Sequence, residues 1–268
     1  MKYQDRYSQY PVAEQKMFDV EGRLQKARKV IAVLEDYLGD LSSLTLLDLA
    51  CSTGIMTRFY SDRFKATAAI DIDTQAVAYA KQFQAHPSVT YYIKDAMKTE
   101  FSADSFDVVT CTQVYEHVPS AAILVDEIYR ILKPGGVCFF GASNRLKLIE
   151  PHYGRLPFLS IIPKPMGHLY LRLLRKADFY YETHLTMWGL RRLVSRFKII
   201  DYTKNIIQDP VRYEATDVMC PNTWRQRCAL LVLRYAYWLF PGYIWLLQKP
   251  GSETHSSCPG AFVARNSG

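Results

Sequence analysis

Hydrophobic positions follow a helical pattern in the first part of the chain and change to strand patterns after residue 40. Over 16–38, apolar side chains recur at steps of three and four, which predicts an amphipathic helix that ends at Gly39. Five short apolar runs alternate with helical stretches and are predicted strands: 45–49, 67–70, 89–93, 106–111 and 137–141. This alternation indicates a doubly wound α/β fold around a parallel sheet.

The alternation stops over 145–185. Prolines interrupt an apolar run at 156–163, and a predicted helical stripe follows from Met166 to Ala177, with Arg172 and Lys176 on its opposite side. An insertion after the fifth strand lies above the carboxyl ends of the strands, where such sheets bind ligands. We therefore predict a substrate lid; the alternative is a pair of helices that only covers the sheet edge.

The last part of the chain returns to regular patterns. Thr186 is a predicted cap of a helix that reaches Phe197, and 198–204 is a predicted strand. An apolar helix over 223–240 precedes a last strand, 243–248, which we expect beside 198–204, so that the helix packs on protein rather than in lipid.

The sequence predicts three consecutive parts of the chain, with a lid inserted into the middle one. A helical cap covers 1–43, and a main domain covers 44–249 with the lid inserted at 145–185. The tail, 250–268, is rich in Gly, Ser and Pro and is predicted to be disordered.

Charge and cysteine content narrow the possible partners and compartments. The 268 residues carry a net charge of +7, and seven basic residues stand against two acidic ones between Arg145 and Asp178. Such an excess attracts an acidic substrate or an anionic membrane surface, or is simply a solvated helix face.

The polar first ten residues predict no secretory signal, and no apolar run is long enough to span a membrane. The six cysteines lack Cys-x-x-Cys spacing, which favours reduced thiols and a cytoplasmic protein.

A small-residue turn carries the main chemical signal. An apolar strand ends at Asp48, the turn from Ala50 to Gly54 follows, and a second strand ends about twenty residues later at Asp71. Small residues let the backbone approach a ligand, and the acid after the second strand accepts hydrogen bonds from ribose hydroxyls. The turn lacks the glycine patterns that bind pyrophosphate, which favours a nucleoside such as S-adenosylmethionine.

These motifs resemble those of class I S-adenosylmethionine-dependent methyltransferases, and most closely the ubiquinone/menaquinone-biosynthesis type, the methyltransferase type 11-like branch that acts on small molecules. The resemblance covers 44–144 and includes the Leu132–Gly136 turn. Ala50 and Ser52 stand where two glycines of the family's first motif usually stand, and Gly54 is retained. The family implies a Rossmann-like, mostly parallel sheet of seven strands whose last strand is antiparallel.

The resemblance also implies how the cofactor is held. Asp71 is expected to bind the ribose, and Asp95 to face the adenine amino group. The full set of expected cofactor-binding residues is Asp48, Ala50, Cys51, Ser52, Gly54, Asp71, Ile72, Asp95, Ala96, Thr112 and Gln113.

Methyl transfer is an in-line displacement from a sulfonium, so alignment and exclusion of water supply much of the rate and a base is optional. His117 is the predicted catalytic base because it follows the fourth strand and an imidazole accepts protons at neutral pH. The alternative is that Glu116 and His117 brace the loop and the methionine end of the cofactor. Residues expected to contact the acceptor are Tyr7, Tyr10, Tyr115, Asn144, His152, Tyr153 and His184, of which the last and His152 are weaker candidates for the base.

Other functions are less well supported by the sequence. No cluster with metal-ligand spacing is present, so no metal is expected. The segment Thr112–Tyr115 replaces the Asn/Asp-Pro-Pro-Tyr/Phe motif of methyltransferases that act on exocyclic base amines, so no nucleic-acid partner is expected, and paired glutamates of protein arginine methyltransferases are missing. A non-catalytic binding or membrane-docking protein remains an alternative. The sequence predicts a cytoplasmic or membrane-peripheral methyltransferase that acts on the oxygen, nitrogen or carbon of a small molecule, hydrophobic or anionic.

Overall fold

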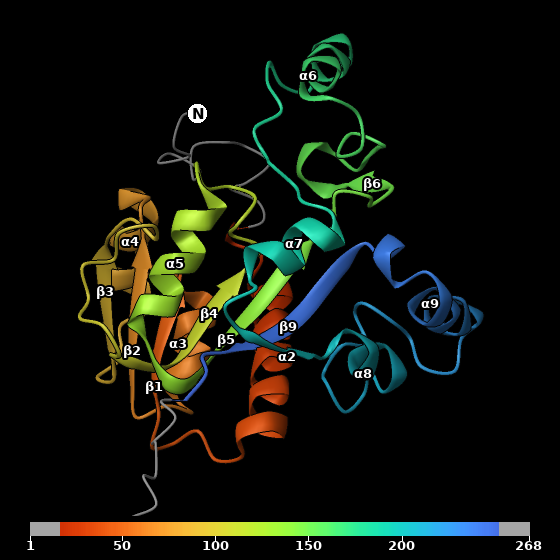
Figure 1. Cartoon of the computed structure of the whole chain (residues 1–268). Helices are drawn as coiled ribbons and strands as arrows, with labels where there is room; N and C mark the ends of the chain where they lie inside the picture. Colours follow the sequence, from red (N-terminus) through yellow and green to blue (C-terminus); the bar gives the residue numbers. More distant parts are fainter. Residues whose placement is uncertain (1–16, 252–268) are drawn as a thin grey trace, which may run out of the picture.

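The computed structural model describes residues 17–251 and contains a seven-stranded sheet (Figure 1). The strands lie in the order β3-β2-β1-β4-β5-β9-β8. Their bounds are β1 Thr45–Leu49, β2 Ala66–Asp71, β3 Val89–Ile93, β4 Phe106–Thr112, β5 Leu132–Ser143, β8 Lys198–Asp201 and β9 Gly242–Gln248. Strands β1 to β5 pair in parallel, and β9 runs antiparallel to both β5 and β8. The predicted mixed sheet with an antiparallel last strand is confirmed.

Helices cover both faces of this sheet because its central strands bury side chains on both sides. Helices α5 (Ala121–Ile131) and α7 (Met187–Leu193) pack on one face through a core that includes Leu47 and Phe140. The helices on the other face are α2 (Val20–Leu38), α3 (Ile55–Ser61), α4 (Thr74–Phe83) and α8 (Thr203–Gln208). Parallel strands that are buried on both faces read as continuous apolar runs, which is the pattern of 45–49 and 106–111.

The predicted cap of α7 forms, and polar side chains cap two further helices in the same way. The side chains of Asp73, Ser120 and Thr186 accept hydrogen bonds from backbone N–H groups in the first turns of α4, α5 and α7. Gly39 ends α2 with a φ of 75°, a conformation that glycine adopts without strain. These short-range signals place the ends of the elements that carry the site.

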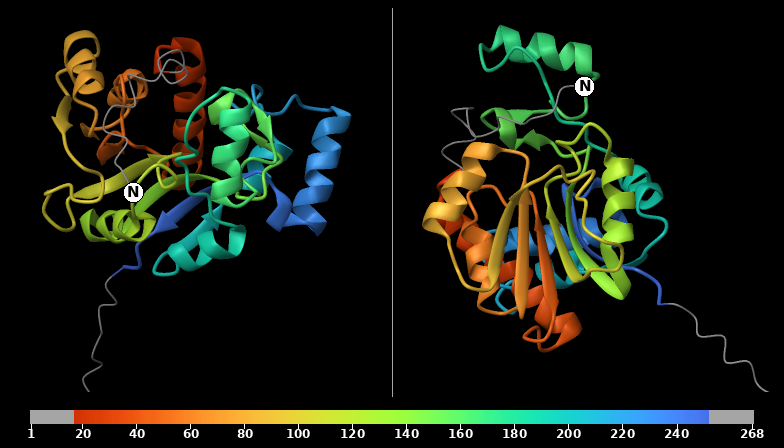
Figure 2. Two further views of the ribbon diagram at one scale, coloured as in Figure 1. Left: turned by 90° about the horizontal axis from the view of Figure 1, so that it is seen from above. Right: turned by 90° about the vertical axis from the view of Figure 1, so that its left-hand side faces the viewer.

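The segment after β5 stands beyond the carboxyl ends of the parallel strands, and α6 is its outermost element (Figures 1 and 2). It contains β6 (Ile149–Glu150), the 3₁₀ turn η2 (Pro151–Tyr153), β7 (Leu156–Pro157) and α6 (Lys164–Leu173). Its two ends meet, since the N–H of Arg145 donates to the carbonyl of Leu185 over 2.9 Å. We call residues 145–185 the lid, and its role as a cover over the substrate stays a prediction.

Part of the predicted apolar stripe of the lid helix does not face the protein. Met166, Leu169 and Leu173 are 58%, 53% and 72% exposed, whereas Leu171 is buried. The lid has only a small core of its own, made by Leu156, Leu159, Leu171 and Tyr180. Periodicity finds an amphipathic helix but does not say what its apolar face contacts, and here that face is left on the surface.

Two predictions for the last part of the chain need correction. Strand β8 ends at Asp201, and Thr203 already belongs to α8, so the predicted strand over 198–204 is too long. The predicted helix over 223–240 divides into α9 (Trp224–Tyr235) and the 3₁₀ turn η3 (Tyr237–Leu239). Helix α9 packs beside α8 at the edge of the molecule, and Trp224 and Tyr235 are more than 70% exposed.

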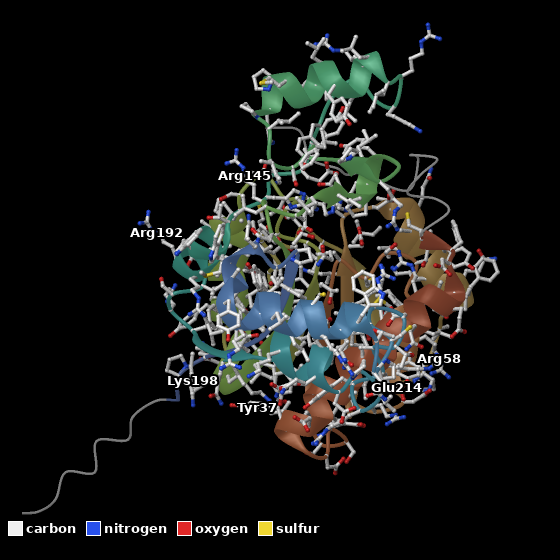
Figure 3. The ribbon with its side chains drawn as sticks, turned by 90° about the vertical axis from the view of Figure 1, so that its right-hand side faces the viewer. Tyr37, Arg58, Arg145, Arg192, Lys198 and Glu214 are labelled. Carbon is white, nitrogen blue, oxygen red and sulfur yellow. The ribbon has the colours of Figure 1, made fainter. Side chains whose placement is uncertain are left out.

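The side view in Figure 3 shows α8 and α9 at the end of the sheet that carries β8, below the level of the lid. Among residues 17–251, no helix combines the length and the apolar character that crossing a membrane requires.

Candidate active site

A cavity of about 740 Å³ opens at the carboxyl ends of the parallel strands. It extends from the turn after β1 and the end of β2 to the loop after β4 and the beginning of η2 in the lid. Its size is in the range of small-molecule and cofactor sites. Most of the residues predicted for cofactor and acceptor line it: Asp48, Ala50, Cys51, Ser52, Asp71, Ile72, Asp95, Ala96, Thr112, Gln113, His117 and His152.

The turn after β1 has the backbone of a glycine turn although it holds one glycine. Ala50, Ser52 and Gly54 have φ values of 62°, 53° and 74°. The N–H of Cys51 donates to the carbonyl of Ile70 over 2.9 Å, which ties the turn to β2. The replacement of two glycines by small residues therefore keeps the shape of the turn, and the left-handed conformation strains Ala50 and Ser52.

The carboxylate of Asp71 lies where the cofactor ribose is expected. One oxygen accepts the N–H of Ser52 over 2.8 Å, and the other accepts the N–H of Asp73 over 2.9 Å. Burial raises the pKa of Asp71. A carboxylate has about four acceptor positions, so Asp71 can also bind a ribose hydroxyl without losing its backbone contacts. The residues present thus fit an adenosine-type cofactor.

Asp48 lines the cavity but has a different set of contacts. Its two oxygens accept the hydroxyls of Thr57, over 2.5 Å, and Thr110, over 2.6 Å. Burial raises the pKa of this carboxyl group. The two hydroxyl contacts join α3 and β4 through β1, which gives Asp48 a structural role at the floor of the cavity.

The sequence analysis missed the contribution of α2. Arg23, Lys26 and Lys29 from this helix line the cavity. The guanidinium of Arg23 donates to the hydroxyl of Ser52 over 3.3 Å, and the Lys29 ammonium lies 3.1 Å from Asp217. The three residues are spaced three apart, on the side of α2 whose apolar positions face the sheet. This spacing is the feature of the sequence from which their place in the cavity could have been predicted. These cations favour the carboxylate of an amino-acid ligand at this end of the cavity.

His117 and its neighbour Glu116 follow β4 beneath the lid. Nδ1 of His117 lies 3.7 Å from the carboxylate of Glu182, and burial lowers the pKa of His117 to about 3. Neither carboxylate oxygen of Glu116 has a hydrogen-bond partner among the described residues, and burial raises the pKa of Glu116 to about 7. His117 thus lies in the cavity as predicted, but at neutral pH it is an uncharged and weak proton acceptor. Its role as a base stays a prediction.

Four residues expected to contact the acceptor do not line the cavity. The hydroxyl of Tyr115 donates to the carbonyl of Ser143 over 2.5 Å and accepts the N–H of Leu185, while Asn144 donates to the carbonyls of Trp238 and Phe240. Both side chains are buried and fasten β5 to its neighbours.

Tyr153 and His184 belong to the polar interior of the lid. The hydroxyl of Tyr153 donates to Glu182 over 2.8 Å, and Nε2 of His184 lies 2.9 Å from Glu150. The remaining two candidates, Tyr7 and Tyr10, lie outside the described residues, as does the predicted tail from residue 252 onward.

A group of three lid residues has the ligand types of a metal site. Atoms of Glu150, His152 and His184 lie within 4.8 Å of one another. However, the ammonium of Lys147 lies 3.0 Å from both Glu150 Oε2 and His184 Nε2 and is buried with them. A cation already balances the Glu150 carboxylate, and a metal ion would be repelled by it. The arrangement therefore favours a lysine-centred ion cluster.

The cavity, the turn after β1 and the acid Asp71 together define the class of protein. A parallel sheet with a nucleoside-binding turn after β1, an acid at the end of β2 and an open cavity over the strand ends is the architecture of class I methyltransferases. Residues 47–140 match the family model described as a methyltransferase domain.

Two curated relatives give the sequence comparison. The ubiquinone biosynthesis O-methyltransferase of Paraburkholderia xenovorans is 32% identical over 162 residues, which are 58% of this chain and 69% of that protein. The protein of the same name from Pseudomonas fluorescens is 34% identical over 109 residues, 40% of this chain and 47% of that protein. Several further proteins of the same name are likewise matched over only about half of their own length.

Solved structures agree with this assignment at the level of the fold. An S-adenosylmethionine-dependent methyltransferase from Mesorhizobium loti aligns with a TM-score of 0.55 at 16% identity, over 86% of this chain and 98% of that one. Phosphoethanolamine N-methyltransferase 1 from Haemonchus contortus aligns with a TM-score of 0.57 at 14% identity, over 93% of this chain and 48% of that one. The chain belongs to the S-adenosylmethionine-dependent methyltransferases.

Proposed function

We propose that this protein methylates a hydroxyl group of a hydrophobic, aromatic small molecule. One observation carries the proposal: a single cavity joins the ribose-binding acid Asp71 to His117 and His152 beneath the lid. The cofactor and an acceptor therefore share one space, with titratable side chains at the acceptor end.

Each part of the cavity has a task in this reaction. S-adenosylmethionine, when bound, supplies a methyl group on a positively charged sulfur. Asp71 and the turn from Ala50 to Gly54 hold the nucleoside, and the cations of α2 face its carboxylate. The lid residues Pro151 and His152 line the acceptor end, where exclusion of water would favour the reaction.

The chemistry of the lining favours an apolar acceptor. The part of the cavity near His117 includes Val118, Pro119 and Pro151. Two relatives bear the name ubiquinone biosynthesis O-methyltransferase, and ubiquinone is a hydrophobic quinone with methoxy groups. Both points support oxygen of an aromatic ring as the methylated atom.

Labelled cofactor tests this proposal. Purified protein would be incubated with methyl-labelled S-adenosylmethionine and a cell extract, which is then divided into organic, aqueous and macromolecular fractions. We expect label in the organic fraction, lost in Asp71→Ala and kept in Asp40→Ala, which removes an exposed acid remote from the cavity. Label on nucleic acid or protein would contradict a small-molecule acceptor. Cofactor binding by calorimetry without any transfer would instead favour a non-catalytic protein.

We further propose that the lid docks on an anionic membrane surface. Met166, Leu169 and Leu173 expose an apolar face on α6, and Phe158 and Phe179 nearby are also more than half exposed. The exposed basic side chains on and around this helix are Arg155, Arg172, Arg175 and Lys176. Apolar side chains at the headgroup boundary and basic ones near anionic lipids are the usual components of interfacial binding.

Vesicle sedimentation tests the docking surface. We expect the protein to bind vesicles that contain phosphatidylglycerol and not to bind vesicles made of phosphatidylcholine. Leu169→Asp with Leu173→Asp should reduce binding at least fivefold. Leu231→Asp is the matched control, because this residue is exposed on α9, away from the lid. Equal loss in the control, or binding that ignores lipid charge, would contradict the proposal.

A further inference from the structure

Glu150 is a buried carboxylate at the root of the lid, in contact with His152, Tyr180, Lys147 and His184. Its Oε1 atom lies 2.5 Å from Nδ1 of His152. Its Oε2 atom accepts the hydroxyl of Tyr180 over 2.9 Å and lies 3.0 Å from the Lys147 ammonium. Burial alone raises the pKa of Glu150, but the contacts with His152, His184 and Lys147 hold it well below the usual range. The carboxylate is therefore ionised at neutral pH.

An ionised carboxylate determines the tautomer of the neighbouring imidazole. A carboxylate only accepts hydrogen bonds, so Nδ1 of His152 carries the proton that lies between the two residues. The lone pair of a neutral His152 is then on Nε2. The contact with Glu150 occupies Nδ1 and leaves Nε2 on the other side of the ring, and the side chain remains 14% exposed. His152 thus has a fixed tautomer and an available acceptor atom.

His152 lies at the acceptor end of the cavity. It lines the cavity together with Pro151, His117 and Val118, and its ring meets that of His117 edge to face at 5.0 Å between centroids. The two candidate bases are therefore neighbours in different electrostatic settings. Nδ1 of His152 lies 2.5 Å from the Glu150 carboxylate, which stabilises a positive imidazolium, whereas Nδ1 of His117 lies 3.7 Å from the carboxylate of Glu182.

We propose that His152, held by Glu150, is the proton acceptor of the methyl transfer. The inference rests on the proposed function. The acceptor oxygen forms the new bond to the methyl carbon, and the electron pair of the broken carbon–sulfur bond stays on sulfur. The hydroxyl proton passes to Nε2 of His152, and the resulting imidazolium is paired with the Glu150 carboxylate. The products are the methyl ether, the neutral thioether and a protonated His152, which loses its proton to water.

Other charged groups surround this pair and influence its pH dependence. The ionisable side chains near His152 are Glu116, His117, Lys147, Glu150, Glu182 and His184. Lys147 brings a positive charge to this cluster, and its ammonium lies 3.0 Å from Glu150. Because Glu150 makes the direct contact, it is the positioning residue of the pair.

A pH profile with a phenolic probe separates this role from a structural one. With 4-nonylcatechol as acceptor, His152→Gln should lower kcat at pH 7 by about 100-fold to 10,000-fold, with unchanged binding of S-adenosylhomocysteine. The variant's rate should recover as pH rises toward about 10, where the phenol ionises unaided. His86→Gln, which removes a histidine outside the cavity, should keep wild-type rates.

A second readout needs no turnover. In ¹⁵N NMR spectra of the wild-type protein, His152 should be protonated at Nδ1 when neutral, assigned by loss of its signal in His152→Gln. An Nε2–H tautomer, or wild-type kcat and pH profile in His152→Gln, would overturn the role of His152 while leaving the proposed function intact. A wild-type protein that binds the cofactor but methylates neither the probe nor any extract component would overturn both.

Discussion

A Cβ atom at Gly54 would lie 2.8 Å from the Cβ atom of Ala80, across the contact between the cofactor turn and α4. The hydroxyl of Tyr91 would be 2.9 Å away, and the backbone of Gly54 has a φ of 74°. Both the space and the conformation therefore require glycine. This close approach brings α4 and β3 against the turn and determines where the turn ends.

Replacing Gly54 by alanine should destabilise the fold. We expect a loss of about 2–4 kcal/mol in the free energy of unfolding, because a left-handed alanine and a steric clash each cost about 1–2 kcal/mol. Urea unfolding measures this loss. Gly135→Ala is the matched control, since Gly135 has a φ of 81° but no atom within 4 Å of the added Cβ. Equal losses in the two variants would show that the clash contributes nothing.

Ala50→Gly should have the opposite effect. Ala50 adopts a φ of 62°, so glycine removes a strain of about 1–2 kcal/mol at an entropic cost of about 0.5–1 kcal/mol. The expected result is a gain of roughly 0.5–1 kcal/mol, seen as a higher unfolding midpoint in urea. Ala103→Gly, at an exposed position without a positive φ, should lose stability instead. A loss in both variants would mean that Ala50 is unstrained.

Asp71 and Asp73 should separate into a binding role and a folding role. Asp71→Ala removes the expected ribose ligand and should weaken S-adenosylhomocysteine binding by roughly 10-fold to 100-fold. Asp73 caps α4, so Asp73→Ala should cost about 1 kcal/mol of stability with a smaller effect on affinity. Calorimetric titration and thermal unfolding of both variants measure the two effects. Equal loss of affinity in the two variants would contradict this division.

Glu116 should make the protein less stable in alkaline solution. Its folded-state pKa of about 7 exceeds the ordinary value of 4.5, so its contribution to stability is present below pH 4.5 and is lost as pH rises through 7. We expect Glu116→Gln to be more stable than wild type at pH 8.5, with a gain on the order of 3 kcal/mol relative to the difference at pH 4.5.

Urea unfolding at both pH values gives this difference. His117, with a pKa of about 3, makes an opposite contribution on the acid side, but this residue is present in both proteins and largely cancels in the comparison. Glu100→Gln, at an exposed glutamate, should show no such pH dependence. A constant difference between Glu116→Gln and wild type would show that Glu116 does not titrate in this range.

The sheet and its cofactor turn were predictable because their signals are local. The runs 45–49 and 89–93 match β1 and β3 residue for residue, and Asp73 and Ser120 cap the predicted helices. Cys51, Cys111 and Cys138 are buried in the core, as expected for small apolar side chains. Burial and short-range capping act over a few residues, so one sequence is enough to recognise them.

The acceptor side was less predictable because its contacts join distant segments. Tyr115 and Asn144 have the right residue types and positions in the chain for a binding site, but long-range hydrogen bonds direct them into the framework. Residue type also does not distinguish His117 from His152. Nδ1 of His152 lies 2.5 Å from Glu150, and that contact exists only in the folded lid.

The closed base of the lid has a consequence for how this protein diverges from its relatives. Arg145 and Leu185 are hydrogen-bonded neighbours, so the chain leaves the sheet and returns to it at one point. A segment anchored in this way can become longer or shorter, or be exchanged for another. The entropic cost of closing the loop then changes little, so the pairing of β5 and β9 is preserved. The nucleoside end of the cavity is thereby insulated from changes at the other end. One excursion of the chain can therefore change while the turn after β1 and Asp71, at the other end of the cavity, keep their places.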